Sequence, residues 1–272
     1  METCYRHPGR ETGVSCSNCG RPICPECMTP TPVGMRCPEC SRQRTRVKTS
    51  ATITRGETPV VTYIVIGICV ALQLGEMASG ATATGSSFGG STVIDNYALF
   101  GPAIADGQVY RLLTAGFLHA GFFHLLVNMY SLWILGMFLE PGIGRVRFVL
   151  IYLVSLLAGS FGALIVTPNA HTVGASGAIF GLLGAGVVVL RHRGISPMQS
   201  GLPLWIGINL VFSFAVPGIS IGGHIGGLIG GALAAVVLFE LPDRVRRLPP
   251  LAPMIAAGAL GAAAVVGSLA VV

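Results

Sequence analysis

A serine flanked by small residues begins one of the apolar segments of this chain, in the run Gly174-Ala175-Ser176-Gly177. Serine acts as a nucleophile when a neighbouring base removes its proton, and glycine lets the backbone approach closely and adopt tight turns. Small residues in apolar helices more often serve packing, so this run alone is a weak indication of catalysis. Its meaning depends on whether other segments supply a base and oxyanion donors.

Other polar residues within apolar segments could act as the base or the oxyanion donors for such a nucleophile. His124 and Asn128 are four residues apart and therefore share one face of the helix expected there, and His224 lies in a glycine-rich run. Polar side chains inside a membrane are costly, which makes each a candidate functional group. The alternative is that they hydrogen-bond neighbouring helices. Glu140 is expected beside an inner loop, where it would pair with an arginine such as Arg145.

The composition indicates that a polytopic membrane protein positions these residues. Of the 272 residues, 52% are hydrophobic and 10% charged, and the mean hydropathy is +0.72. The polar, cysteine-rich start has no apolar signal-peptide segment, so we expect the first span to direct targeting. The expected membrane spans are residues 60–78, 118–139, 147–167, 174–190, 202–217, 219–239 and 251–271.

The basic residues predict how these spans are oriented. Sixteen of the 17 Lys and Arg residues fall on one side of the expected spans, and only Arg111 falls on the other. The positive-inside rule then predicts a cytosolic N-terminus and an extracytoplasmic C-terminus in the plasma (cytoplasmic) membrane. The second, fourth and sixth spans would begin at the outer face. The histidines, the asparagine and the serine named above would lie within about the first two turns of these spans, where helix N-termini favour negative charge.

Glycines predict close packing between the fourth and sixth spans. Small residues at four-residue spacing let a second helix approach to backbone contact. The sixth span has two such ridges, one of Gly222, Gly226 and Gly230 and the other of Gly223, Gly227 and Gly231. The fourth span has a matching face of Gly177, Gly181 and Gly184. The serine and His224 would then meet near the starts of their helices.

A cysteine-rich segment precedes the spans. Its four pairs, each with two residues between the partners, are Cys4 and His7, Cys16 and Cys19, Cys24 and Cys27, and Cys37 and Cys40. These ligands suffice for two tetrahedral Zn²⁺ sites, and a disulfide cluster is the alternative. Few hydrophobic residues accompany them, so bound metal would supply the folding energy. A cross-brace, with the first and third pairs on one ion and the second and fourth on the other, and a sequential pairing both fit. Reduced cysteines agree with the cytosol.

Residues 97–235 resemble the rhomboid family of intramembrane serine proteases in the order and spacing of their motifs. The matching residues are Tyr110-Arg111, Phe117-Leu118-His119, His124, Asn128, Gly136, Glu140, Gly174, Ser176, Gly177, His224, Gly226, Gly227 and Gly230. Tyr110 departs from the family, which usually has tryptophan there. The N-terminal segment resembles B-box-type zinc fingers, which usually bind proteins.

The rhomboid resemblance implies an enzyme that cleaves transmembrane segments of membrane proteins near the outer face. Ser176 would be the nucleophile, and His224 would be the general base and then the general acid. His124, Asn128 and the backbone amide of Ser176 would form the oxyanion hole. No acidic residue is expected near His224, which favours a Ser-His dyad without a catalytic cofactor. The supporting residues implied are His119, Gly174, Gly177, Phe180, Arg111 and Glu140.

The expected fold is an all-α polytopic membrane protein with a six-helix rhomboid core and a seventh C-terminal span, preceded by a small zinc-binding module. Its parts are the module at 1–41, a basic cytosolic linker at 42–59, the core at 60–240, a cytosolic linker at 241–250 and the last span at 251–272. The module would bind a cytosolic protein partner or regulate the enzyme, and no nucleic acid is expected.

Two other functions remain open at this point. A non-proteolytic rhomboid-like protein would bind membrane clients without cutting them, but Ser176 and His224 are both intact. A transporter would show paired broken helices and charged groups at the membrane midplane, whereas the polar residues here gather at one outer depth.

Overall fold

The computed structural model describes residues 2–31, 34–42, 58–78, 92–216, 218–245 and 248–272. The chain divides into two compact units, Met1–Ile53 and Thr54–Val272. Most of the basic linker expected at 42–59 lies outside the described residues, as does the first part of the segment 79–117 between the first two expected spans.

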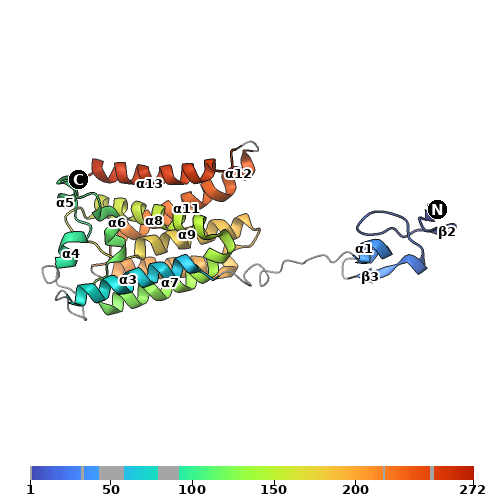
Figure 1. Ribbon diagram of the computed structural model, residues 1–272, viewed down its shortest axis with the longest axis horizontal. Helices are drawn as coiled ribbons and strands as arrows, with labels where there is room; N and C mark the ends of the chain where they lie inside the picture. Colours follow the sequence, from blue (N-terminus) through green and yellow to red (C-terminus); the bar gives the residue numbers. More distant parts are fainter. Residues whose placement is uncertain (1, 32–33, 43–57, 79–91, 217, 246–247) are drawn as a thin grey trace. The chain divides into compact units, whose positions relative to one another are not determined.

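Short strands and turns make up the N-terminal unit, drawn in blue in Figure 1. Its elements are β1 (Glu2–Cys4), β2 (His7–Thr12), η1 (Pro25–Cys27), β3 (Thr29–Thr31), β4 (Gly34–Arg36) and α1 (Pro38–Arg42). β1 pairs with β2 and β3 with β4, both antiparallel. Among its described residues Ile23 is fully buried together with six cysteines, whereas Val14 and Met35 are exposed. The unit therefore has very little apolar core apart from its cysteines.

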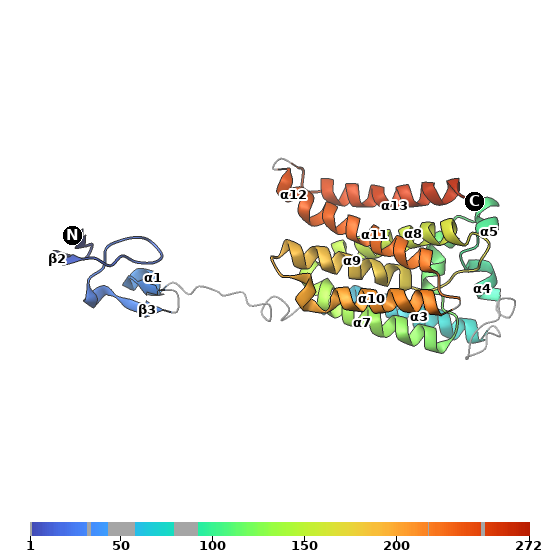
Figure 2. The ribbon, with the colours of Figure 1, turned by 180° about the vertical axis from the view of Figure 1, so that it is seen from behind.

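Helices form the second unit. They are α3 (Val60–Ala78), α4 (Thr92–Tyr97), α5 (Gly101–Ala105), α6 (Arg111–Thr114), η2 (Ala115–Phe117), α7 (Phe122–Ile143), α8 (Arg145–Val166), α9 (Ser176–His192), η3 (Pro197–Ser200), α10 (Leu202–Ala215), α11 (Ile221–Ala235), the π-helical turn η4 (Val236–Glu240), α12 (Leu241–Arg244) and α13 (Ala252–Ala270). Figures 1 and 2 show the long helices running alongside one another as a bundle, with α13 along one edge.

Among the described helices, five are long and apolar enough to cross a membrane. They are α3, α7, α8, the continuous segment Ile221–Arg244 and α13. The expected fourth and fifth spans correspond to apolar helices of only 17 and 14 residues, α9 and α10. Apolar helices thus occur at all seven expected positions, but two are shorter than the roughly 20 residues of a typical span. The expected α-helical, multi-pass membrane fold is confirmed for the second unit.

α11 and α9 meet through their backbones. A Cβ atom added to Gly227 would overlap the carbonyl oxygen of Gly177, and one added to Gly231 would overlap that of Gly181. Any side chain at these positions of α11 would force the helices apart, because a side-chain carbon cannot occupy the space of a carbonyl group. The close packing predicted between the fourth and sixth spans is therefore confirmed.

The opposite ridge of α11 packs on α8, which the sequence interpretation did not anticipate. A Cβ on Gly222 would overlap the carbonyl oxygen of Gly162, and a Cβ on Gly226 would overlap that of Ala158. α11 therefore lies between α8 and α9 with backbone contact on both sides, an arrangement that fixes the position of His224.

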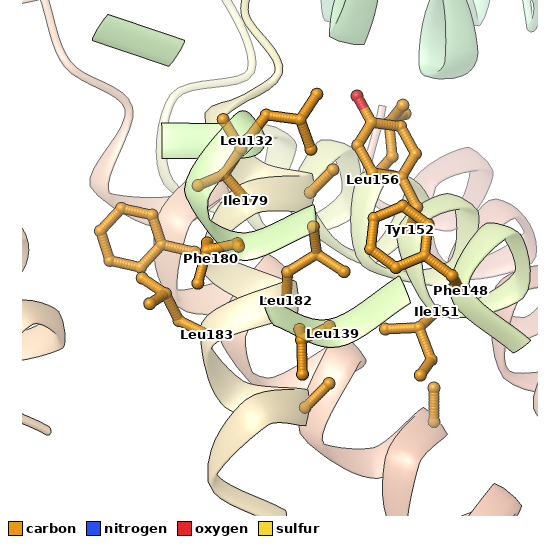
Figure 3. Close-up of a cluster of buried hydrophobic side chains, with 14 of the residues drawn as sticks. Leu132, Leu139, Phe148, Ile151, Tyr152, Leu156, Ile179, Phe180, Leu182 and Leu183 are labelled. Carbon is orange, nitrogen blue, oxygen red and sulfur yellow. The ribbon is translucent and has the colours of Figure 1, made fainter. Parts of the chain in front are cut away.

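The apolar core joins α7, α8 and α9 (Figure 3). Its large buried side chains interdigitate, as expected at the packing density of protein interiors. Those labelled in the figure are Leu132, Leu139, Phe148, Ile151, Tyr152, Leu156, Ile179, Phe180, Leu182 and Leu183. This core holds the helix that begins at Ser176 against the helix that carries His124.

Candidate active site

Ser176 is the first residue of α9, and the turn before it requires glycine. Gly174 has a φ of +128°, in the region that residues with a side chain rarely adopt. A Cβ added there would lie 2.9 Å from His124 Nε2 and 3.8 Å from Ser176 Oγ. Gly174 thus permits both the backbone turn and the close approach of the His124 ring to the serine.

His224 lies in the first turn of α11, which is capped by Ser220. The Ser220 hydroxyl accepts a hydrogen bond from the backbone N–H of Gly223 at 3.2 Å, as N-cap serines commonly do. His224 Nε2 lies 2.7 Å from Ser176 Oγ. The Phe180 ring stacks on the imidazole, with 4.1 Å between centroids and 17° between planes. The structure therefore brings together the serine, the histidine and the aromatic side chain named from the sequence.

The sequence interpretation missed one polar neighbour of His224. Ser213 on α10 is buried, and its Oγ lies 2.6 Å from His224 Nδ1. Asn209 and Ser213 are four residues apart and share a helix face, which was the available signal. Among the hydrogen bonds of the described residues, a hydroxyl and not a carboxylate is the partner of His224 Nδ1.

His124 lies in the first turn of α7 with its tautomer fixed. The backbone N–H of Ala120 donates to His124 Nδ1 at 3.2 Å. Because this nitrogen accepts, a neutral His124 carries its proton on Nε2, which faces Gly174. Asn128 is buried, and its Nδ2 donates to the backbone oxygen of His124 at 2.8 Å. Nε2 of His124 is thus available as a donor beside the serine.

Arg111, the first residue of α6, and His119, which follows η2, are both buried in the segment before α7. The His119 ring meets the His124 ring edge-on, with 5.2 Å between centroids. Arg111 Nη1 donates to the backbone oxygen of Ala98 at 2.8 Å, and its Nε donates to Gln108 Oε1 at 2.8 Å. Of these two expected supporting residues, His119 therefore contacts His124, whereas Arg111 holds the preceding loop through its hydrogen bonds.

Glu140 does not pair with Arg145 as the sequence interpretation expected. Its carboxylate accepts hydrogen bonds from the backbone N–H groups of Val61 and Thr62, both at 2.9 Å, and from the Thr62 hydroxyl at 2.7 Å. These donors lie at the N-terminus of α3, where backbone N–H groups lack partners within the helix. Gly136 leaves the space that Thr62 occupies. Glu140 therefore caps α3 and ties it to α7.

Two separate groups of ligands gather in the N-terminal unit. One consists of Cys4, His7, Cys24 and Cys27, and the other of Cys16, Cys19, Cys37 and Cys40. Within each group the ligand atoms lie within 4.8 Å of one another. The first and third pairs thus share one group and the second and fourth the other, as in a cross-brace. The seven cysteines of these two groups form no disulfide.

The distances within both groups suit a tetrahedral metal ion. His7 Nδ1 lies 3.3 Å from Cys24 Sγ and 3.5 Å from Cys27 Sγ, and Cys19 Sγ lies 3.9 Å from Cys37 Sγ. Metal–sulfur bonds of about 2.3 Å in a tetrahedron separate two sulfur atoms by about 3.8 Å. The residues present therefore fit two metal ions.

The protonation of these thiols depends on their surroundings. The backbone N–H of Cys37 donates to Cys16 Sγ at 3.3 Å and lowers the pKa of Cys16 to about 6. Arg21 Nε donates to Cys19 Sγ at 3.3 Å and lowers the pKa of that thiol. Burial raises the pKa of Cys27 to about 11. Some thiols thus favour the metal-binding thiolate already, and others must lose a proton when metal binds.

A multi-pass helical bundle in which a half-buried serine meets a buried histidine at two helix N-termini defines the class of this protein. Residues 106–241 match the family model described as the rhomboid domain, and the chain belongs to the rhomboid family. It is 38% identical over 201 residues to "Rhomboid protease GluP" of Bacillus subtilis, covering 72% of this chain and 38% of that protein.

Two further relatives cover more modest parts of this chain. "Putative rhomboid protease YdcA" of Bacillus subtilis is 35% identical over 145 residues, which are 52% of this chain and 73% of that protein. "RHOMBOID-like protein 7" of Arabidopsis thaliana is 38% identical over 151 residues, 53% and 47% of the two chains. The chain thus spans less than half of two of these relatives. Two of these relatives carry names that describe rhomboid proteases, one of them as putative.

Proposed function

We propose that this chain is an intramembrane serine endopeptidase that cleaves transmembrane segments of membrane proteins near the outer face of the membrane. Ser176 and His224 form its catalytic dyad. The observation that carries the proposal is the 2.7 Å separation of Ser176 Oγ and His224 Nε2, in a chain of the rhomboid family. A nucleophile within hydrogen-bonding reach of its base is the arrangement that covalent hydrolysis requires.

The chemistry follows from these two side chains. Ser176 Oγ attacks the carbonyl carbon of the scissile peptide bond while His224 Nε2 takes the hydroxyl proton. The imidazolium then gives this proton to the leaving amine as the peptide C–N bond breaks, which leaves an acyl-enzyme. Water, deprotonated by His224, hydrolyses the ester and restores Ser176. Phe180, stacked on His224, limits rotation of the ring through these steps.

The oxyanion of the tetrahedral intermediate is stabilised by donors beside Ser176. His124 offers its Nε2–H because its Nδ1 accepts from Ala120. The backbone amide of Ser176 lies at the N-terminus of α9, where the helix dipole favours negative charge. The Asn128 side chain supplies the third donor. Removing one oxyanion donor typically costs about 2.7–4 kcal/mol of transition-state stabilisation.

The orientation and the metal complete the proposal. The distribution of basic residues supports a cytosolic N-terminus and an extracytoplasmic C-terminus in the cytoplasmic membrane. Zn²⁺ is the metal that best suits two Cys/His sets of four. The two ions are structural, and catalysis uses no metal or other cofactor. The zinc module, on the cytosolic side, binds a protein partner or regulates the enzyme.

Loss of the nucleophile tests this proposal. Ser176→Ala and His224→Ala should each lower cleavage of a model transmembrane substrate by roughly 10⁶-fold, as in other serine proteases. Ser176→Ala should also abolish labelling by a fluorophosphonate probe. Ser268→Ala, at a buried serine of α13 that bonds Ala264 at 2.8 Å, is the control and should retain both. Cleavage at the wild-type rate by Ser176→Ala would refute the serine-protease mechanism, and a wild-type protein that binds but never cuts would indicate a client-binding protein.

A further inference from the structure

α10 contributes a hydroxyl group to the site that the proposed dyad does not use. Ser213 is 5% exposed, and its Oγ has two neighbours within hydrogen-bonding distance. One is His224 Nδ1 at 2.6 Å, and the other is the backbone oxygen of Asn209 at 2.7 Å. A buried hydroxyl with two such short contacts is fully engaged, so its single proton has a determined place.

Counting donors and acceptors fixes the direction of both hydrogen bonds. The carbonyl oxygen of Asn209 can only accept, so the Ser213 proton must point toward it. The Ser213 oxygen is then left to accept, and His224 Nδ1 must carry the hydrogen. A neutral His224 therefore has its lone pair on Nε2, the nitrogen 2.7 Å from Ser176 Oγ. This is the tautomer that can remove the serine proton.

We infer that Ser213 is a positioning residue for proteolysis, which holds His224 in its basic tautomer and accepts from Nδ1–H when the ring becomes an imidazolium. The inference rests on the proposed function. In a Ser-His-Asp triad, a carboxylate performs this task. Here a neutral hydroxyl does so, at a depth where a carboxylate would be costly to bury.

The second histidine beside Ser176 is held in the opposite tautomer. Its Nδ1 accepts from a backbone N–H group, whereas His224 Nδ1 donates to a hydroxyl. The hydrogen-bond partner of each Nδ1 thus decides whether the Nε2 of the same ring carries a hydrogen or a lone pair. His124 presents a hydrogen to the oxyanion, and His224 presents a lone pair to the nucleophile. Ser213 is therefore what distinguishes the base from the oxyanion donor.

A matched pair of substitutions tests the hydroxyl separately from its volume. Threonine and valine have nearly the same shape, and only threonine keeps the hydroxyl. Ser213→Val should lower kcat by about ten- to a hundredfold with KM unchanged, well below the roughly 10⁴-fold loss when a triad aspartate is replaced. Ser213→Thr should keep kcat within about threefold of the wild type. Ser268→Ala, which removes a similar bond to the preceding turn away from the site, should leave kcat unchanged.

A measurement without substrate separates this inference from the proposed function. The ¹⁵N shifts of His224 should report a protonated Nδ1 in the wild type and in Ser213→Thr, and a mixture of tautomers in Ser213→Val. Equal kcat values for the valine and threonine variants, a change confined to KM, or an unprotonated Nδ1 in the wild type would each overturn the role of Ser213. Cleavage that persists in Ser176→Ala would instead overturn the dyad, and the tautomer measurement would still decide the hydrogen bond.

Discussion

In the N-terminal unit, eight ligand side chains converge on two points, and its described residues bury almost no apolar side chain besides the cysteines. In the second unit, Thr54–Val272, which we call the membrane unit, the positions of the functional residues depend on glycines. The lack of a side chain at these glycines lets α11 contact α8 and α9 through the backbone. The first unit needs particular atoms to be present, and the second needs atoms to be absent. Ligand removal should therefore break the first unit, and an added methyl group should break the second.

The largest effect is expected from metal removal. A strong chelator should unfold the N-terminal unit of the full-length protein, since its described residues bury few apolar groups besides cysteine. Hydrogen exchange followed by mass spectrometry should show loss of protection in residues 2–42 only. Cleavage of a purified transmembrane substrate should continue at the same rate. A chelated protein that keeps its N-terminal protection would contradict the proposed role of the metal.

A methyl group on α11 should destabilise the membrane unit. Gly227→Ala places a Cβ on the Gly177 carbonyl, at the start of the helix that carries Ser176. Overpacking of this kind costs about 1–3 kcal/mol or more, and cleavage should fall because α11 also carries His224. Unfolding in detergent and turnover measure the two effects. Gly258→Ala on α13, where a Cβ would meet nothing within 4 Å, should leave both unchanged or stabilise the helix slightly; equal losses in the two variants would refute the contact argument.

A smaller effect is expected at the cap of α3. Glu140→Gln keeps the shape of the side chain but removes the charge that accepts three hydrogen bonds. Bonds to charged groups contribute about 1.5–3 kcal/mol, so the midpoint of unfolding should fall measurably. Glu26→Gln, in the exposed pair with Arg10, should have no measurable effect, because surface ion pairs contribute little. A midpoint that responds as strongly to Glu26 as to Glu140 would contradict this ranking.

The structure agrees with the sequence-based predictions that rest on residue type and spacing alone. Cysteine spacing indicates eight ligands, and glycine ridges indicate that the fourth and sixth spans meet, because both are local patterns. The partner of a polar group is not a local property. Glu140 lies near Arg145 in sequence, yet the N-terminus of α3, about 80 positions away, supplies its donors. Ser213 likewise becomes a neighbour of His224 only when α10 and α11 fold together.

The shortness of α9 has a consequence for the bilayer itself. Its 17 residues extend about 26 Å at 1.5 Å per residue, less than the roughly 30 Å of a hydrocarbon core. In the proposed orientation Arg191 and Arg193, at its inner end, remain at the cytosolic headgroups, so Ser176 lies below the outer boundary of the acyl chains. The position of Ser176 along the membrane normal is then set by its distance from the cytosolic headgroups. In a thicker bilayer the same enzyme would act further beneath the outer surface, so lipid thickness would help to select which peptide bond of a given substrate is cut.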